Sequence, residues 1–441
     1  FEADINSLNN TDIFITRLDG MSYDAGVGFE IGYCLAKSVP LYIFNTDFYK
    51  NKLLSNFEYK LSPIIDKIAN VFKYEYINDS KLEYEDELDF NINLFSKFVY
   101  EKINNTKEIT LISEYPLTYL KTDSKDYENS DINKWLKEVF EDNLNNKTYN
   151  LLKNKVCIDS INKIEKTTCN KTYDERYATL PSLTDYINTG AANSFINNSK
   201  YTYLSNTNSE GNYWYINDEG KVDTDSDNDI YGIKITITLS SSTKLINGSG
   251  TKDDPYKIED KNNYFGSYVK LENDIWRIYE VNDDNDEIKL MLNDYIKSNN
   301  TDLTYIYSNS NYYHNDSKAK TLAYYLNNTY LNSLSYKENI NNAKWANYYY
   351  DNSYSEILNN TIDTKVSLPS IGNIILNNEL TNYFTNTGID KTSNKVYVIN
   401  NNGTVTETKT SSKAKVIPCI SIKKSILTKG SGTIEDPYET E

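Results

Sequence analysis

The stretch GSGTKDDPY, residues 248–256, returns near the end of the chain as GSGTIEDPY, residues 430–438. Upstream of both copies the similarity continues in one order and at a nearly constant spacing. The matching pairs are 233–237 with 416–420, WYINDEG 214–220 with YVINNNG 397–403, 203–207 with 383–387, LPSL 180–183 with LPSI 368–371, and 108–111 with 287–290. Shared landmarks in a shared order predict an internal repeat.

Each copy is expected to be mixed α+β, mostly strand with one helix. We name residues 93–258 repeat 1 and residues 259–441 repeat 2. Repeat 2 opens with a predicted hairpin, in which strands 275–279 and 288–291 flank an acidic turn at 282–286. A helix is expected over 318–331, matched by 131–140 in repeat 1. The Gly-Ser-Gly-Thr segments are predicted to be flexible joints.

The repeats resemble the tandem modules of large bacterial surface proteins, whose core is similar to the C-type-lectin-like, formylglycine-generating-enzyme-like fold. The late strand of that fold usually reads Gly-Val-Arg-Pro. Residues 232–235 (Gly-Ile-Lys-Ile) and 415–418 (Lys-Val-Ile-Pro) depart from it. The resemblance implies an exported chain whose repeats bind a ligand at the cell surface.

Residues 1–92 have a different, α/β pattern. A short apolar strand at 12–16 is followed by a helical spacing over 29–37 and a second apolar strand at 40–44. A strand–helix–strand unit with apolar strands predicts a parallel sheet, here a truncated flavodoxin-like domain. Truncation is expected because the chain begins at Phe1 and not at Met. The expected architecture is therefore multidomain, with this domain followed by the two repeats.

The loop after the first strand concentrates glycines and carboxylates. It contains Asp19, Gly20, Asp24, Gly26 and Gly28 and leads to Glu30 in the first turn of the expected helix. Ligands of open parallel sheets bind at the carboxyl ends of the strands, and glycines allow the backbone to approach a ligand closely. The positive end of the helix dipole keeps Glu30 ionised. An ionised carboxylate beside other carboxylates suits retaining glycosyl transfer.

This segment, DAGVGFEIGYC at residues 24–34, resembles the Asp-x-Gly-x-x-x-Glu-x-Gly-Tyr-Ala signature of nucleoside 2-deoxyribosyltransferases. The resemblance implies that Glu30 is the nucleophile, that Asp24 supports it and contacts the sugar, and that Asp4 handles the proton at the base. Asp19 and Gly20 match the family's Leu-Asp-Gly loop, and with Gly26 and Gly28 they are assigned to substrate binding.

The same resemblance implies a nucleoside or deoxynucleoside substrate, no metal, no organic cofactor and self-association. The family's later Asn-Leu-Met segment has no clear counterpart around residues 53–56. Cys34 also stands where the family often has a small residue.

Net charge and the cysteine and histidine content limit which partners, metals and compartments fit the chain. A charge of −17 disfavours binding to nucleic acid or to anionic membranes, and no stretch is apolar enough to span a bilayer. Cys157 and Cys169 either form a disulfide, which fits an oxidising compartment, or stay reduced. His314 is the only histidine, which argues against a metal site containing histidine. The alternating aspartates 223–229 lack the EF-hand glycine and glutamate, and are interpreted as a solvated loop.

Two functions follow from the sequence. The first is cleavage of a nucleoside N-glycosidic bond through a covalent glutamyl intermediate, with transfer to another base or to water. The alternative is a non-enzymatic surface or adhesion protein with a vestigial front domain. Location separates them, because nucleoside salvage is cytoplasmic and surface repeats are exported.

Overall fold

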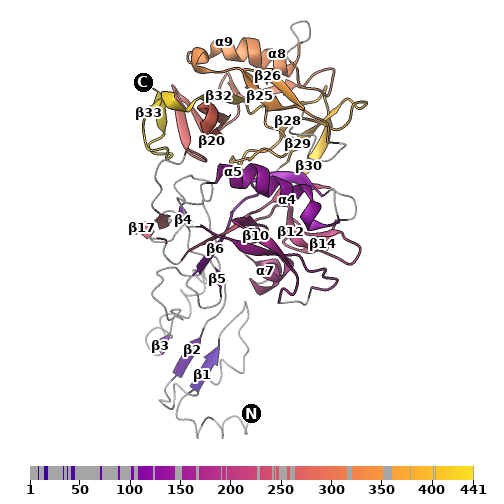
Figure 1. The fold of residues 1–441 in the computed structure, drawn as a ribbon, viewed down its shortest axis with the longest axis vertical. Helices are drawn as coiled ribbons and strands as arrows, with labels where there is room; N and C mark the ends of the chain where they lie inside the picture. The colour runs from indigo at the N-terminus through magenta and orange to yellow at the C-terminus, as the bar shows by residue number, and fades with distance from the viewer. Residues whose placement is uncertain are drawn as a thin grey trace. The chain divides into compact units, whose positions relative to one another are not determined.

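The computed structural model divides the chain into two compact units, residues 1–84 and 85–441 (Figure 1). It describes residues 8, 14–17, 33, 37, 41–44, 70–71, 88–89 and 101–103 of the first part of the chain. From 108 to 440 it describes every residue except 123–124, 145–150, 165–167, 190, 195, 226–228, 241–242, 244, 248–255, 259–263, 315–319, 351–359, 378, 401 and 403. The described part is multi-sheet and mostly strand, with few helices.

The first unit contains a parallel sheet of order β1-β2-β3. Its strands are β1 (Phe14–Arg17), β2 (Leu41–Phe44) and β3 (Asn70–Val71). Both strand pairs are parallel, as expected for the strand–helix–strand pattern. Between β1 and β2, the Lys37 amide donates to the Tyr33 carbonyl at 3.0 Å, which closes one helical turn. The predicted strands and their parallel pairing are confirmed, whereas the flavodoxin-like architecture as a whole extends outside the described residues.

Repeat 1 is built on two five-stranded sheets. One contains β5 (Glu101–Ile103), β6 (Glu108–Ile112), β8 (Leu151–Leu152), β11 (Ala178–Thr179) and β16 (Thr236–Leu239). The other has the order β14-β13-β12-β15-β7, with β7 (Thr118–Lys121), β12 (Thr202–Thr207), β13 (Tyr213–Ile216), β14 (Val222–Thr224) and β15 (Ile230–Ile233). A separate hairpin pairs β9 (Asn154–Cys157) with β10 (Thr172–Arg176).

Repeat 2 has a seven-stranded sheet, a five-stranded sheet and two two-stranded ribbons. The large sheet contains β19 (Tyr268–Leu271), β20 (Asp274–Asn282), β21 (Glu287–Leu292), β27 (Val366–Ser367), β32 (Cys419–Lys423), β33 (Leu427–Lys429) and β34 (Tyr438–Thr440). The smaller contains β24 (Thr304–Ile306), β28 (Tyr383–Gly388), β29 (Lys395–Ile399), β30 (Val405–Lys409) and β31 (Lys413–Lys415). The ribbons are β22 (Lys297–Ser298) with β23 (Thr301–Asp302), and β25 (Ala343–Ala346) with β26 (Thr361–Thr364).

The strand ladders of the two repeats have matching registers. Glu101 pairs with Thr110 between β5 and β6, and Glu280 pairs with Lys289 between β20 and β21. In the same way Ile237 pairs with Leu111, and Ile420 pairs with Leu290. In these ladders the sequence match and the strand register agree. In the β12–β13 and β28–β29 ladders the equivalent residues Ile216 and Ile399 lie opposite Thr202 and Tyr383, so the match of 203–207 with 383–387 is one residue out of register there. The predicted hairpin at 275–291 is confirmed, with its turn at Asp283–Asn285.

Each repeat contains one longer helical stretch with a π-helical middle (Figure 1). In repeat 1, α4 (Asp131–Trp135), the π segment η2 (Leu136–Phe140) and α5 (Glu141–Asn143) follow one another. In repeat 2 the corresponding elements are α8 (Leu322–Tyr324), η5 (Tyr325–Tyr330) and α9 (Leu331–Ser333). The helix expected at 131–140 is confirmed. The second begins at Leu322 and not at 318, because the Thr321 side chain caps it by accepting from the Tyr324 amide.

The second Gly-Ser-Gly-Thr segment is not the flexible joint that the sequence suggested. Gly430 and Gly432 both have φ of +83°, and the amides of Ser431 and Gly432 donate to the Asp436 carbonyl. This turn leads into β34, which pairs in parallel with β19. In the same way β18 (Tyr256–Ile258) pairs in parallel with β4 (Leu88–Asp89). At the end of repeat 2 the segment therefore leads into a strand that pairs beside an early strand of that repeat, and at the end of repeat 1 the partner strand β4 lies just before residue 93.

The two repeats share one hydrophobic core. Its cluster of contacting buried side chains includes Leu117 and Trp135 of repeat 1 and Ile371 and Ile375 of repeat 2. Hydrogen bonds cross the boundary at the same place: the Trp135 indole donates to the Gly372 carbonyl at 2.7 Å, and the Ile375 amide donates to the Leu117 carbonyl at 2.8 Å. The repeats therefore form one packed unit.

Gly372 accounts for the different backbone path by which residues 370–376 of repeat 2 contact repeat 1. In repeat 1, Ser182 and Asp185 form a capping box that starts helix α7 (Leu183–Asn188), which covers a smaller core of its own. In repeat 2, the Ser370 amide and hydroxyl likewise donate to the Asn373 side-chain oxygen, but the Asn373 amide donates to the Ser370 carbonyl, whereas the Asp185 amide donates to the Ser182 hydroxyl. There, however, Gly372 has a φ of +88°, which a helix cannot contain. The chain leaves the helical path and presents its carbonyls to repeat 1.

Substituting Gly372 tests this account. Gly372→Ala is expected to lower the free energy of unfolding of the second unit by about 1–2 kcal/mol, because an L side chain is strained in the left-handed region. Gly372→Asn is the matched control and should cost less, because asparagine tolerates that region better than other residues. Denaturant titration followed by tryptophan fluorescence measures both. Equal stability of the alanine variant and the natural chain would contradict the account.

Candidate functional site

The predicted catalytic and substrate-binding residues lie in the first unit. Asp4, Asp19, Gly20, Asp24, Gly26, Gly28 and Glu30 all fall outside the residues that the structure describes. Their roles therefore stay predictions. What the structure does describe are the elements on either side of the motif in sequence: β1 before it, and Tyr33 with Lys37 after it.

These flanking elements define one edge of the parallel sheet. Arg17, the last residue of β1, is in register with Phe44, the last residue of β2. The carboxyl ends of both strands therefore meet at one edge, and the motif follows β1 directly in sequence. In open parallel sheets this edge is where ligands bind. Lys37 ends the helical turn with its ammonium 5.7 Å from the Tyr33 ring centroid.

Residues 1–84 match the family model of nucleoside 2-deoxyribosyltransferases. The match covers about a fifth of the chain and includes every predicted site residue. It ends at residue 84, where the first compact unit also ends. No curated protein and no solved structure matches the chain. The front segment is therefore related in sequence to a family of nucleoside-processing enzymes, while repeats 1 and 2 have no family assignment.

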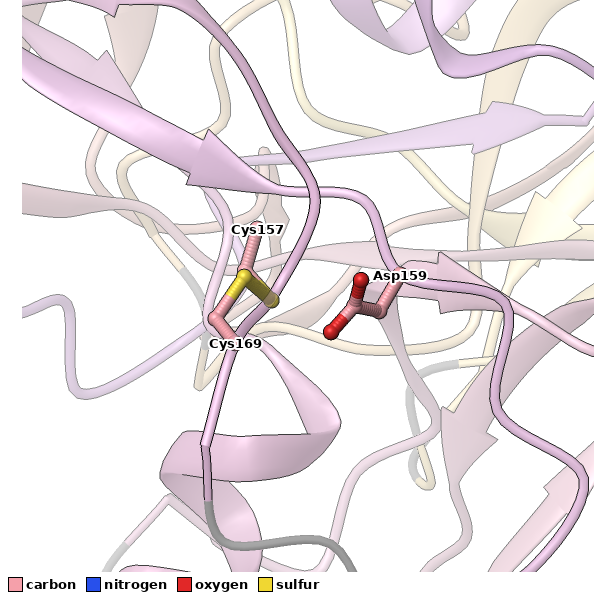
Figure 2. Close-up of side chains that lie close together, drawn as sticks. All are labelled: Cys157, Asp159 and Cys169. Atoms are coloured by element: carbon pink, nitrogen blue, oxygen red, sulfur yellow. A yellow bond between two sulfur atoms is a disulfide. The ribbon is translucent and has the colours of Figure 1, made fainter.

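In the second unit, Cys157, Asp159 and Cys169 lie together (Figure 2). The two cysteines form a disulfide, which decides between the alternatives that the sequence left open. Asp159 is 5% exposed, and its carboxylate accepts from the Asn170 amide at 2.6 Å. The bridge joins the end of β9 to the chain leading into β10, and so closes the loop between these two strands.

The same cluster is, among the described residues, a group whose ligand atoms lie close enough to hold a metal ion, within 4.8 Å of one another. Metal binding needs thiolates, and sulfurs joined in a disulfide offer none. The surrounding hydrogen bonds are structural. The Asn206 side-chain amide donates to the Asp159 backbone carbonyl at 2.9 Å, and the Ser205 hydroxyl donates to the Cys157 backbone carbonyl at 2.6 Å. The cluster therefore connects the β9–β10 loop to β12.

The acidic stretch 223–229 is only partly the solvated loop expected from the sequence. Asp225 is 5% exposed and accepts from the Tyr203 hydroxyl and from the Asp229 amide. The interpretation was wrong for this residue because the buried hydroxyl of Tyr203, distant in sequence, needs a partner. Beside the Asp225 carboxylate, burial raises the pKa of Tyr203 well above its usual value. The alternating aspartates alone do not indicate that Asp225 bonds to a buried tyrosine.

The remaining candidates are structural. Tyr313, Tyr348 and Tyr350 are buried, and the hydroxyls of the first two donate to the carbonyls of Val366 and Ile371. These three tyrosines therefore belong to the core. His314 is half-buried, with Nδ1 2.9 Å from the Tyr312 carbonyl. No helix in the described parts of the chain is long and apolar enough to cross a membrane.

Removal of the disulfide tests its contribution. The double variant Cys157→Ser with Cys169→Ser is expected to lose about 2–4 kcal/mol of stability, because the unfolded chain regains the freedom of the open loop. A thiol reductant should lower the melting temperature of the natural chain towards that of the double variant. The double variant is its own control, since reductant should leave its melting temperature unchanged. A reductant effect of equal size on both proteins would show that the bridge does not stabilise the fold.

Proposed function

We propose that residues 1–84 carry a nucleoside deoxyribosyltransferase or N-glycosidase activity. The observation that carries the proposal is the family match, which includes the whole carboxylate-rich motif. It is supported by the parallel pairing of β1 and β2, because ligands bind at the carboxyl edge of such sheets and the motif follows β1 in sequence.

The proposed chemistry needs only carboxylates. The Glu30 carboxylate attacks the anomeric carbon of the nucleoside, and the bond from that carbon to the base nitrogen breaks. The base leaves with its electron pair and takes a proton from Asp4. A second base, or water, then attacks the anomeric carbon, gives its proton to the Asp4 carboxylate and releases Glu30 as a carboxylate. Asp24 supports Glu30 and contacts the sugar, while Asp19, Gly20, Gly26 and Gly28 shape the substrate loop.

The test is release of free base from a panel of 2′-deoxynucleosides. Glu30→Gln should reduce the rate by roughly a thousandfold or more, because the amide has the shape of the carboxylate but is a very poor nucleophile. Glu58→Gln, outside the motif, is the matched control and should retain activity. Mass spectrometry of the quenched natural protein should detect a deoxyribosyl adduct that Glu30→Gln lacks. Equal rates for Glu30→Gln and the natural chain would refute the assignment.

A second candidate function rests on the disulfide. Disulfides persist mainly in oxidising compartments, so the Cys157–Cys169 bridge favours an exported chain, as in the surface-repeat alternative. On this proposal the repeats bind a ligand outside the cell, and the front segment is an appendage.

Localisation separates the alternatives. For an exported chain, protease added to intact cells of the source should digest the repeats, and alkylation before reduction should leave Cys157 and Cys169 unmodified. A cytoplasmic chain should resist the protease until the cells are lysed. Base release by an exported chain would show that both functions reside in one protein.

A further inference from the structure

The contact between the repeats joins one segment of repeat 2 to one site on repeat 1. The segment, residues 370–376, we call the docking segment. The site, which we call the docking site, consists of Leu117, Thr118 and Trp135. The Thr118 hydroxyl donates to the Asn373 carbonyl at 2.8 Å, in addition to the bonds of Trp135 and Leu117 described above. All three docking-site residues are at most 1% exposed.

Register identifies the corresponding place in repeat 2. The Leu117 amide donates to the Ile233 carbonyl at 2.8 Å, and the Ile296 amide donates to the Val416 carbonyl at 3.0 Å. Ile233 and Val416 are equivalent in the repeat alignment. Ile296 is therefore the counterpart of Leu117, and its carbonyl is the group of repeat 2 that a docking segment would use. Leu303 takes the place of Thr118, so the hydroxyl that bonds the docking segment is absent from repeat 2.

Repeat 2 instead has extra residues at this point. Repeat 1 passes directly from Leu117 into β7, whereas repeat 2 inserts residues 297–302 before Leu303 and β24. The insertion is the hairpin β22–β23, with Asn299 and Asn300 at φ of 50° and 63° in its turn. Consecutive positive φ values are those of the tight turn that suits the twist of a two-residue hairpin.

The hairpin satisfies the group that docking would use. In repeat 1 the Leu117 carbonyl accepts from Ile375 of the other repeat; in repeat 2 the equivalent Ile296 carbonyl accepts from Leu303, at 2.7 Å. Asp302 anchors the hairpin by pairing with Lys297 at 2.6 Å and with Lys415 at 3.0 Å. The Lys415 ammonium also lies 4.1 Å from the Tyr295 ring centroid.

The counterpart of Lys415 shows why repeat 1 has no such anchor. Gly232 and Lys415 occupy the same bridge position, opposite Thr202 and Tyr383 respectively. A Cβ at Gly232 would lie 2.5 Å from Pro116, so a side chain there would displace the short turn that precedes Leu117. Repeat 1 thus has no hairpin here, and its Leu117 carbonyl is available to the docking segment. Repeat 2 has a polar hairpin in this place, whose residues 297–301 are exposed.

We propose that the hairpin of residues 297–302 is a cap that prevents a further module of this fold, carrying a docking segment like 370–376, from adding to repeat 2. Head-to-tail contacts extend indefinitely unless a terminal copy blocks them, and terminal repeats present a polar outer face. The opposite end is closed as well, because the segment of repeat 1 equivalent to the docking segment is folded onto its own core as α7. The two repeats therefore form a closed pair.

The first test moves the cap. The residues Lys-Ser-Asn-Asn-Thr-Asp are inserted after Leu117 in the full chain, and Gly232 is left unchanged because a side chain there would itself displace the turn before Leu117. Hydrogen exchange at the Ile375 amide should accelerate by about tenfold or more, because that amide loses its acceptor. The matched control inserts the same residues in the exposed turn at Ser209 and Glu210, where Ile375 should stay protected. Full protection of Ile375 in the capped repeat 1 would overturn the proposal.

The second test removes the cap, and it keeps the proposal testable if the first variant does not fold. A second copy of residues 259–441 is appended to the full chain and marked by Glu379→Asp in its exposed loop, so that its peptides differ in mass. With the hairpin intact, the appended docking segment should exchange freely. With residues 297–302 deleted, and with Leu303→Thr to supply the hydroxyl and Lys415→Gly in the original repeat 2, it should become protected by about tenfold or more. Protection with the hairpin present, or none after its deletion, would overturn the proposal.

Discussion

The second unit depends on one backbone constraint, the left-handed conformation of Gly372. Because of it, residues 370–376 leave the path that residues 182–188 follow as a helix, and their carbonyls reach Trp135 and Thr118. These bonds accompany burial of Ile371, Ile374 and Ile375, and buried apolar area is the dominant stabilising contribution in such contacts. Gly372 occupies the position of Thr184, which lies in helix α7 of repeat 1, so the two segments diverge in backbone path from this position onward.

Sequence reasoning predicted the features that depend on short-range pattern. Alternating apolar residues predicted the hairpin of β20 and β21, and helical spacing predicted the helix at 131–140. The apolar strands around residues 14–17 and 41–44 predicted a parallel sheet. It missed features that depend on partners distant in sequence. Asp225 is buried because Tyr203 needs an acceptor, and residues 430–432 are ordered because β34 pairs with β19. Neither partner can be read from the local pattern.

The candidate site shows the same division between local and distant signals. A nucleophile motif is compact in sequence, so Glu30, Asp24 and the glycines between them could be identified from one segment, which the family match also includes. The function of the repeats has no such compact signal. Their polar groups, such as the Asn206 amide and the Ser205 hydroxyl beside Cys157, hold the fold together through contacts that arise only when distant strands meet.

The disulfide and the proposed chemistry suggest different compartments, but they are chemically compatible. An oxidising environment disables catalysis that depends on a free thiolate, because the thiolate is the species that is oxidised. Glycosyl transfer through Glu30 uses carboxylates, whose protonation depends on pH and not on redox state. Cys34 is the last residue of the motif segment 24–34 but has no part in the proposed steps. The Cys157–Cys169 bridge therefore bears on the compartment in which the chain resides. It does not affect the chemistry proposed for residues 1–84, which uses carboxylates.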